Sequence, residues 1–107
     1  MTRSGRLPDP FTLAEVGSDN LRIELFKSEL AMCSTFSVLA TIKYGAGNRY
    51  SAERSLGHAE EAYAAALPLA SDPKHSKHFT GEIIQEFTAE LDRLREKLDE
   101  LQRLLQR

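Results

Sequence analysis

The sequence predicts an all-α protein with three antiparallel helices, in which a helical hairpin is followed by a long C-terminal amphipathic helix of coiled-coil character. Two observations predict this fold: apolar residues recur at helical spacing in three long segments, and short turns containing glycine or proline separate these segments. Short connections make neighbouring helices antiparallel. The 107 residues, 28% of them charged and with a net charge of −2, fit one small soluble domain and exclude a two-domain enzyme.

Residues 1–17 are expected to form a flexible N-terminal arm ahead of a single helical domain at residues 18–107. The segment contains two prolines and two glycines among few large apolar side chains. This mixture disfavours a helix and supplies too little surface for a core. Its apolar residues either lie against the domain or a partner, or belong to an untethered tail; they are Phe11, Leu13 and Val16.

A first helix is predicted over residues 19–44, where Ser18 and Asp19 are suitable N-cap residues. Its apolar residues form two rows, and a helix with so wide an apolar face is usually packed between two neighbours. The helix should end at residues 44–48, where two glycines and an asparagine tolerate a left-handed backbone. One row is Leu21, Leu25, Met32, Phe36 and Leu39; the other is Ile23, Phe26, Leu30, Cys33, Ser37 and Ala40.

A second, alanine-rich helix is predicted over residues 50–69. Small residues let two helix backbones approach closely, so Ala59, Ala62 and Ala66 are expected to mark the contact line with the first helix. Pro68 lacks an amide donor, so the last turn is expected to be distorted or to end near Leu67. The apolar face comprises Ala52, Leu56, Ala59, Ala62 or Tyr63, Ala66 and Ala70, and a loop at residues 71–74 follows.

The third helix, predicted over residues 78–105, carries the most regular pattern. Its apolar residues are spaced by 3, 4, 3, 4, 3 and 4 positions, as in a coiled-coil seam. At about 1.5 Å per residue the helix extends roughly 40 Å, which is more than the second helix covers. Its C-terminal leucines are therefore expected to need another surface. The seam consists of Ile84, Phe87, Leu91, Leu94, Leu98, Leu101 and Leu105.

Part of the chain resembles a known helical repeat. The run at residues 59–69, with small residues, Tyr63, an Ala-Leu pair and then Pro68, is similar to the second helix of a tetratricopeptide repeat, and Gly47 and Tyr50 lie near the spacing of that family's first helix. The resemblance implies a helical hairpin and protein binding. The segments Gly-Asn-Arg at 47–49, Ala-Glu-Arg-Ser at 52–55 and Ala-Glu-Glu-Ala-Tyr at 59–63 are also similar to small bacterial helical proteins without an assigned function.

One cluster of metal-type ligands is visible in the sequence. Asp72, His75, His78 and Glu82 lie close together in the chain, and His78 and Glu82 share a face if the third helix has begun there. Two neutral imidazoles and a carboxylate can hold zinc, although Lys77 between the histidines disfavours a cation. The alternative is an exposed polar loop with solvated histidines. We therefore expect no metal and no cofactor, and keep His75, His78 and Glu82 as candidate ligands.

Other reactive residues lack the neighbours that catalysis needs. Cys33 lies in an apolar row, where a buried thiol behaves as a small hydrophobic residue, and no activating group is evident near His58. A lone cysteine makes no intrachain disulfide, and no signal peptide is visible, so a cytoplasmic location is expected. Acidic and basic residues alternate on the third helix, which disfavours nucleic acid and a membrane surface as partners. No stretch has about eighteen uncharged apolar residues, the usual mark of a membrane span.

The sequence thus favours a non-catalytic protein-protein interaction module and not an enzyme. The expected partner is a second copy, giving a homodimer, or another helical protein. The alternative within the same fold is that the leucines pack inside a monomer, and a different class is a small metal-binding or enzymatic protein that uses the histidine cluster. The expected protein interface consists of Leu91, Leu94, Leu98, Leu101 and Leu105.

Overall fold

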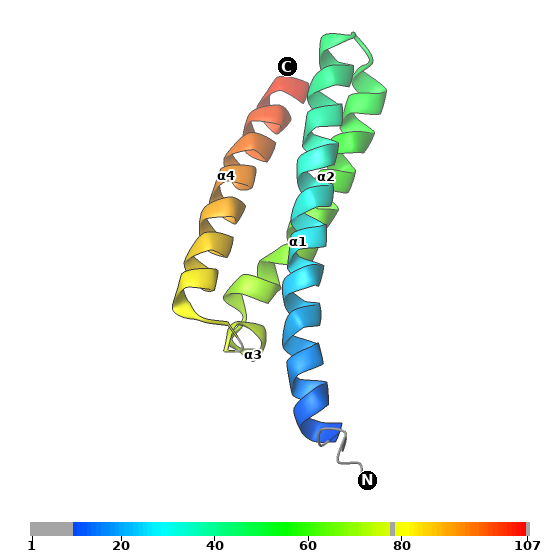
Figure 1. The fold of residues 1–107 in the computed structure, drawn as a ribbon. Coiled ribbons are helices and arrows are strands. Elements are labelled where there is room, and N and C mark those ends of the chain that lie inside the picture. The colour runs from blue at the N-terminus through cyan, green and yellow to red at the C-terminus, as the bar shows by residue number, and fades with distance from the viewer. Residues whose placement is uncertain (1–9, 78, 107) are drawn as a thin grey trace.

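The fold is all-α, as the sequence predicts. A computed structural model describes the backbone of residues 10–77 and 79–106 and the side chains of residues 20–77 and 79–106. Within these ranges the chain forms four helices and no strand: α1 (Pro10–Gly45), α2 (Arg49–Ser71), α3 (Pro73–Ser76) and α4 (Gly81–Leu105). In Figure 1, α1 and α2 run in opposite directions from a tight turn, and α4 runs beside them, starting near α3.

Helix α1 is longer than the sequence predicts. It begins at Pro10, inside the segment expected to be an arm, and it continues through Gly17, Ser18 and Asp19. Proline fits the first turn of a helix, because an amide hydrogen there would have no acceptor within the helix. Residues 1–9, the rest of that expected arm, lie outside the described residues. The N-terminal turns of α1 project past α3 and the start of α4 in Figure 1.

The turn between α1 and α2 matches the expected stop signal. The amide of Asn48 donates to the carbonyl of Lys43 at 2.9 Å, and Gly47 has a φ of 83°, in the left-handed region that favours glycine. The Asn48 side chain then accepts a hydrogen bond from the amide of Ser51 and caps α2. A turn this short keeps α1 and α2 in contact along their length.

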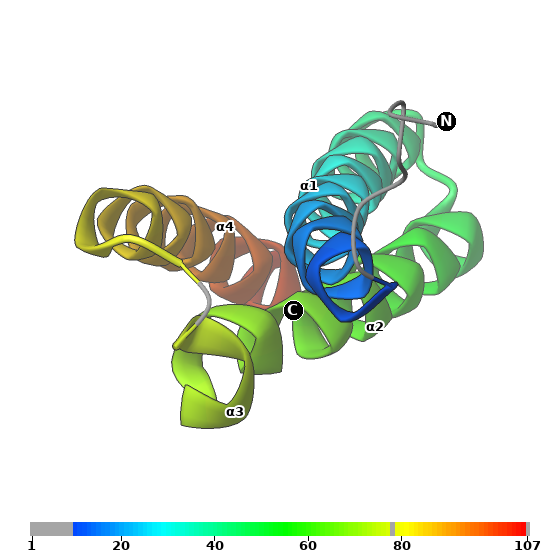
Figure 2. The same cartoon turned by 60° about the horizontal axis from the view of Figure 1, so that its bottom comes forward.

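Helix α2 does not end near Leu67 but continues through Pro68 to Ser71. The Pro68 carbonyl still accepts a hydrogen bond, at 2.9 Å from the amide of Asp72, so only the donor side of the ladder is lost. Asp72 then caps α3, the short helix that occupies the predicted loop. Seen along the helices in Figure 2, α2 passes beneath α1 and leads through α3 to the start of α4.

The core has two parts, both centred on α2. The alanine stripe is buried as predicted, and Ala59 and Ala62 pack with Cys33 and Ala40 of α1. Aromatic rings fill the other part, near α3, where Phe26 of α1 meets Phe79 and Phe87. Helix α1 contacts α2 far more extensively than α4. The molecule is elongated, with a radius of gyration of 18.6 Å, against about 13 Å for a compact domain of this length.

Candidate interaction surface

The leucine seam of α4 lies in the core of the single chain. Leu91, Leu98, Leu101 and Leu105 are buried and Leu94 is half-buried, all against α1 and α2. This is the alternative that the sequence left open, in which the leucines pack inside one chain. A side chain that already packs in the core is not available to a partner without unfolding, so the four buried leucines do not form an exposed surface in the single chain.

The residues of the expected metal cluster are not brought together by the described part of the chain. Asp72 accepts the amide hydrogen of Lys74 at 2.9 Å and so acts as a helix cap. Glu82 is exposed in the first turn of α4, and His78 lies outside the described residues. Among the described residues, no group of three or more His, Cys, Asp and Glu side chains could hold a metal ion. His75 is half-buried, and its Nδ1 atom has no hydrogen-bond partner.

Cys33 and His58 have defined surroundings. Burial raises the pKa of the Cys33 thiol to about 11, so at neutral pH the group is a protonated thiol packed against alanines. His58 is half-exposed; its ring tilts against Phe36 with centroids 5.0 Å apart, and Nδ1 lies 3.3 Å from Glu61. The carboxylate partner of His58, three residues along α2, was not recognised from the sequence.

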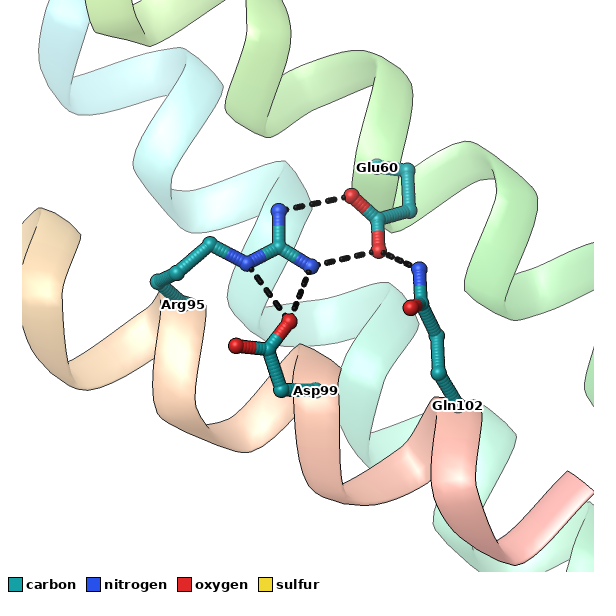
Figure 3. A network of polar contacts seen from close by, with 4 residues as sticks. All are labelled: Glu60, Arg95, Asp99 and Gln102. Atoms are coloured by element: carbon teal, nitrogen blue, oxygen red, sulfur yellow. Dashed lines mark hydrogen bonds and ion pairs between the residues drawn. The ribbon is translucent and has the colours of Figure 1, made fainter.

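A polar network joins α2 to α4. The Arg95 guanidinium donates to both carboxylate oxygens of Glu60, at 2.9 and 2.7 Å, and its Nε donates to Asp99 at 2.9 Å (Figure 3). The amide of Gln102 also donates to Glu60. Arg95 further lies over the Tyr63 ring, 4.9 Å from its centroid, and the hydrogen bond to Glu60 raises the pKa of Arg95. With its acceptors occupied, Glu60 is a structural residue of the interface between α2 and α4.

The largest unpaired apolar feature lies on α1. Five large apolar side chains of α1 are exposed to solvent: Leu21 (70%), Leu25 (50%), Met32 (46%), Val38 (51%) and Ile42 (60%). Val38 lies on the side of α1 that faces α4. Three of them belong to the first apolar row predicted for this helix. Helix α1 packs against two neighbours, α2 and α4, as the sequence predicts. Within its first row only Phe36 packs on the core and Leu39 is half-buried, so the other three residues of that row stay exposed. We call these five residues the α1 stripe.

The α1 stripe follows the repeat of a coiled-coil seam. Leu21, Leu25, Ser28, Met32, Thr35, Leu39 and Ile42 are spaced by 4, 3, 4, 3, 4 and 3 residues. Val38 lies beside this line, and Leu39 within it is half-buried. Part of this spacing is already visible in the first apolar row predicted from the sequence. The interface was nevertheless predicted on α4, because the leucines of that helix are spaced more regularly.

One described helix segment, Asn20–Gly45, is long and apolar enough to cross a membrane by length and composition. The sequence predicts no span here, because a span usually has about eighteen uncharged apolar residues and polar side chains interrupt this segment. Core helices of soluble proteins pass the same test, but they are mostly buried, and only 22% of this window is buried. Most of the apolar surface of α1 is therefore uncovered within the single chain.

Two adjoining hollows, of about 380 and 270 Å³, lie on the surface between α1 and α4. Leu30 and Ser34 line both, and Glu90 lies at their common rim. Cations and anions are mixed along this groove, with Lys27 on one side and Glu86 on the other, so its charge selects no particular ligand. Val38 at its end links the groove to the α1 stripe.

No protein-family model, curated protein or solved structure matches this chain. The tetratricopeptide resemblance and the likeness to small bacterial helical proteins stay predictions. Tyr50 and the run at residues 59–69 lie on one continuous helix, α2, and Gly47 lies in the turn before it.

Proposed function

We propose that the protein is a non-catalytic helical interaction module that self-associates through the α1 stripe. The proposal rests on the α1 stripe, in which five large apolar side chains of one helix are each 46% to 70% exposed. Exposed apolar patches of this size mark interaction sites in soluble proteins. The proposed surface differs from the one predicted by sequence, because the leucines of α4 are used inside the chain.

The area of the stripe supports a second copy as the partner. Five side chains at these exposures offer on the order of 500 Å² from each copy, and thus about 1,000 Å² in a pair, the lower bound of a specific interface. An interface between identical surfaces needs no further component.

Charge placement favours a protein partner over lipid. Glu24 and Lys27 are exposed between Leu21 and Met32 on α1. Charges that flank a heptad seam are typical of helix pairs in water. The stripe is therefore better suited to a helix than to acyl chains.

Light scattering over a hundredfold dilution tests the proposal. The wild-type chain should have twice the mass of a single chain, and Leu25→Glu should shift it to the monomer mass without loss of helix content by circular dichroism. Leu67→Glu on α2 is the matched control, because Leu67 is also an exposed leucine, at 39%, but lies off the stripe. A wild-type chain that is monomeric at every concentration would refute self-association. Binding of that monomer to vesicles of neutral phospholipid would assign the stripe to a membrane.

A further inference from the structure

The order of large and small residues along α1 restricts how two copies pair. Within the seam, Leu25, Met32 and Leu39 occupy one set of heptad positions, which we call the a positions, and Leu21, Ser28, Thr35 and Ile42 occupy the d positions. Three a residues are large, whereas the two central d residues are small and polar. The fit of two identical helices therefore depends on their relative direction.

A parallel pair places each d residue against its own copy. Ser28 would face Ser28 of the second chain, and Thr35 would face Thr35, so the two layers that flank the central Met32 layer would lack large apolar side chains. Where large side chains are missing at the centre of an interface, the surrounding atoms of both helices lose dispersion contacts. A parallel pair would also bring Glu24 close to Glu29 of the second chain, since these flanking positions meet in parallel coiled coils.

An antiparallel pair avoids both defects. When the a positions of one chain meet the d positions of the other, Leu25 faces Ile42, Met32 faces Thr35, and Leu39 faces Ser28. Each small polar residue then has a large apolar residue opposite, which fills the layer. The two-fold axis passes between Met32 and Thr35, so the interface is the same patch on both chains, as a closed dimer requires.

We infer that two copies of this chain pair through α1 in an antiparallel arrangement, with Ser28 of each copy opposite Leu39 of the other. This inference rests on the proposed self-association and specifies its geometry. Helix α1 is the central element of the resulting assembly, with α2 and α4 of each copy on its outer side. In this register the turn between α1 and α2 of one copy, at residues 46–48, lies beside residues 19–21 of the other.

Disulfide trapping tests the direction of pairing. Two variants are made in a Cys33→Ala background, one carrying Ser28→Cys and the other Leu39→Cys. In the antiparallel dimer the two copies of residue 28 are eleven residues apart along the helix axis, about 16 Å, and a disulfide requires Cα atoms within about 7 Å. Each variant alone should therefore stay uncrosslinked under mild oxidation, and a mixture of the two should give the disulfide-linked heterodimer.

The possible failures are distinguishable. Rapid disulfide formation by Ser28→Cys alone would show a parallel pair, which overturns the inference and leaves self-association intact. A dimer by light scattering that crosslinks in neither experiment would show that another surface pairs, which overturns both. Monomer mass for the Cys33→Ala parent and the wild type would remove the proposed function itself. Asn48→Cys at the turn, mixed with Ser28→Cys, serves as the control for random collision.

Discussion

Phe26 of α1 and Phe87 of α4 stack with their ring centroids 3.7 Å apart and their planes 19° from parallel. Phe79 meets Phe87 edge-on, at 5.5 Å, and completes an aromatic cluster at the end of the bundle near α3. Because α1 and α4 have fewer contacts with each other than either has with α2, this stack is a principal contact between them. Phe87 also lines one of the two hollows between these helices.

Phe87→Ala should separate the N-terminal half of α4 from α1. The substitution removes a buried ring, and buried aromatic to alanine changes cost about 3 to 5 kcal/mol. Urea unfolding measures the loss, and hydrogen exchange should show faster exchange in the first turns of α4 than in its last turns. Equal exchange along α4 would contradict the role assigned to the stack.

Leu98→Ala should lower the free energy of unfolding by about 2 to 5 kcal/mol, because Leu98 is fully buried between helices of the same chain. This substitution distinguishes two possible roles of the α4 leucines, as core residues of one chain or as interface residues between two chains. A core leucine destabilises the fold at every protein concentration, whereas an interface leucine changes only the association equilibrium. Denaturation of monomeric Leu25→Glu with and without Leu98→Ala makes this measurement, and no change in midpoint would mean that the seam is not core.

Glu60→Ala should lower the free energy of unfolding by about 1 to 3 kcal/mol, since it leaves a half-buried guanidinium without its bidentate partner. A double-mutant cycle with Arg95→Ala isolates the pair, with an expected coupling of at least about 0.5 kcal/mol. The matched control is the exposed pair of Arg49 and Glu53 on α2, whose coupling should stay below about 0.5 kcal/mol. Similar coupling in the two pairs would contradict the structural role of Glu60.

Cys33 should make stability fall as pH rises above about 9. The unfolded thiol ionises near its ordinary pKa of 9.0, whereas the folded thiol, desolvated by burial, stays protonated until about 11. Between these values the unfolded chain binds fewer protons, so alkali favours unfolding. Cys33→Ala removes this contribution, and its unfolding midpoint should fall less between pH 8 and pH 10.5 than that of the wild type. Parallel decline of the two proteins would show that Cys33 is not the group responsible.

The sequence by itself determined the helices, because their signals are local. Apolar spacing and the turn at Gly47 and Asn48 depend on residues within a few positions of each other, and the structure confirms an all-α chain with this turn. The buried alanine face of α2 could be predicted from the sequence for the same reason. The start of α1 was missed because a proline that opens a helix and a proline in an irregular segment look alike in sequence.

Tertiary structure alone decided which apolar faces are covered. The row containing Leu25 and the seam containing Leu98 have the same kind of spacing, and periodicity gives no information on what lies opposite a face. The structure buries Leu98 and exposes Leu25 because α4 packs on α2 and on one side of α1, which leaves the other side open. The pairing of Glu60 with Arg95 was likewise invisible, since residues 35 positions apart meet only when α2 and α4 dock.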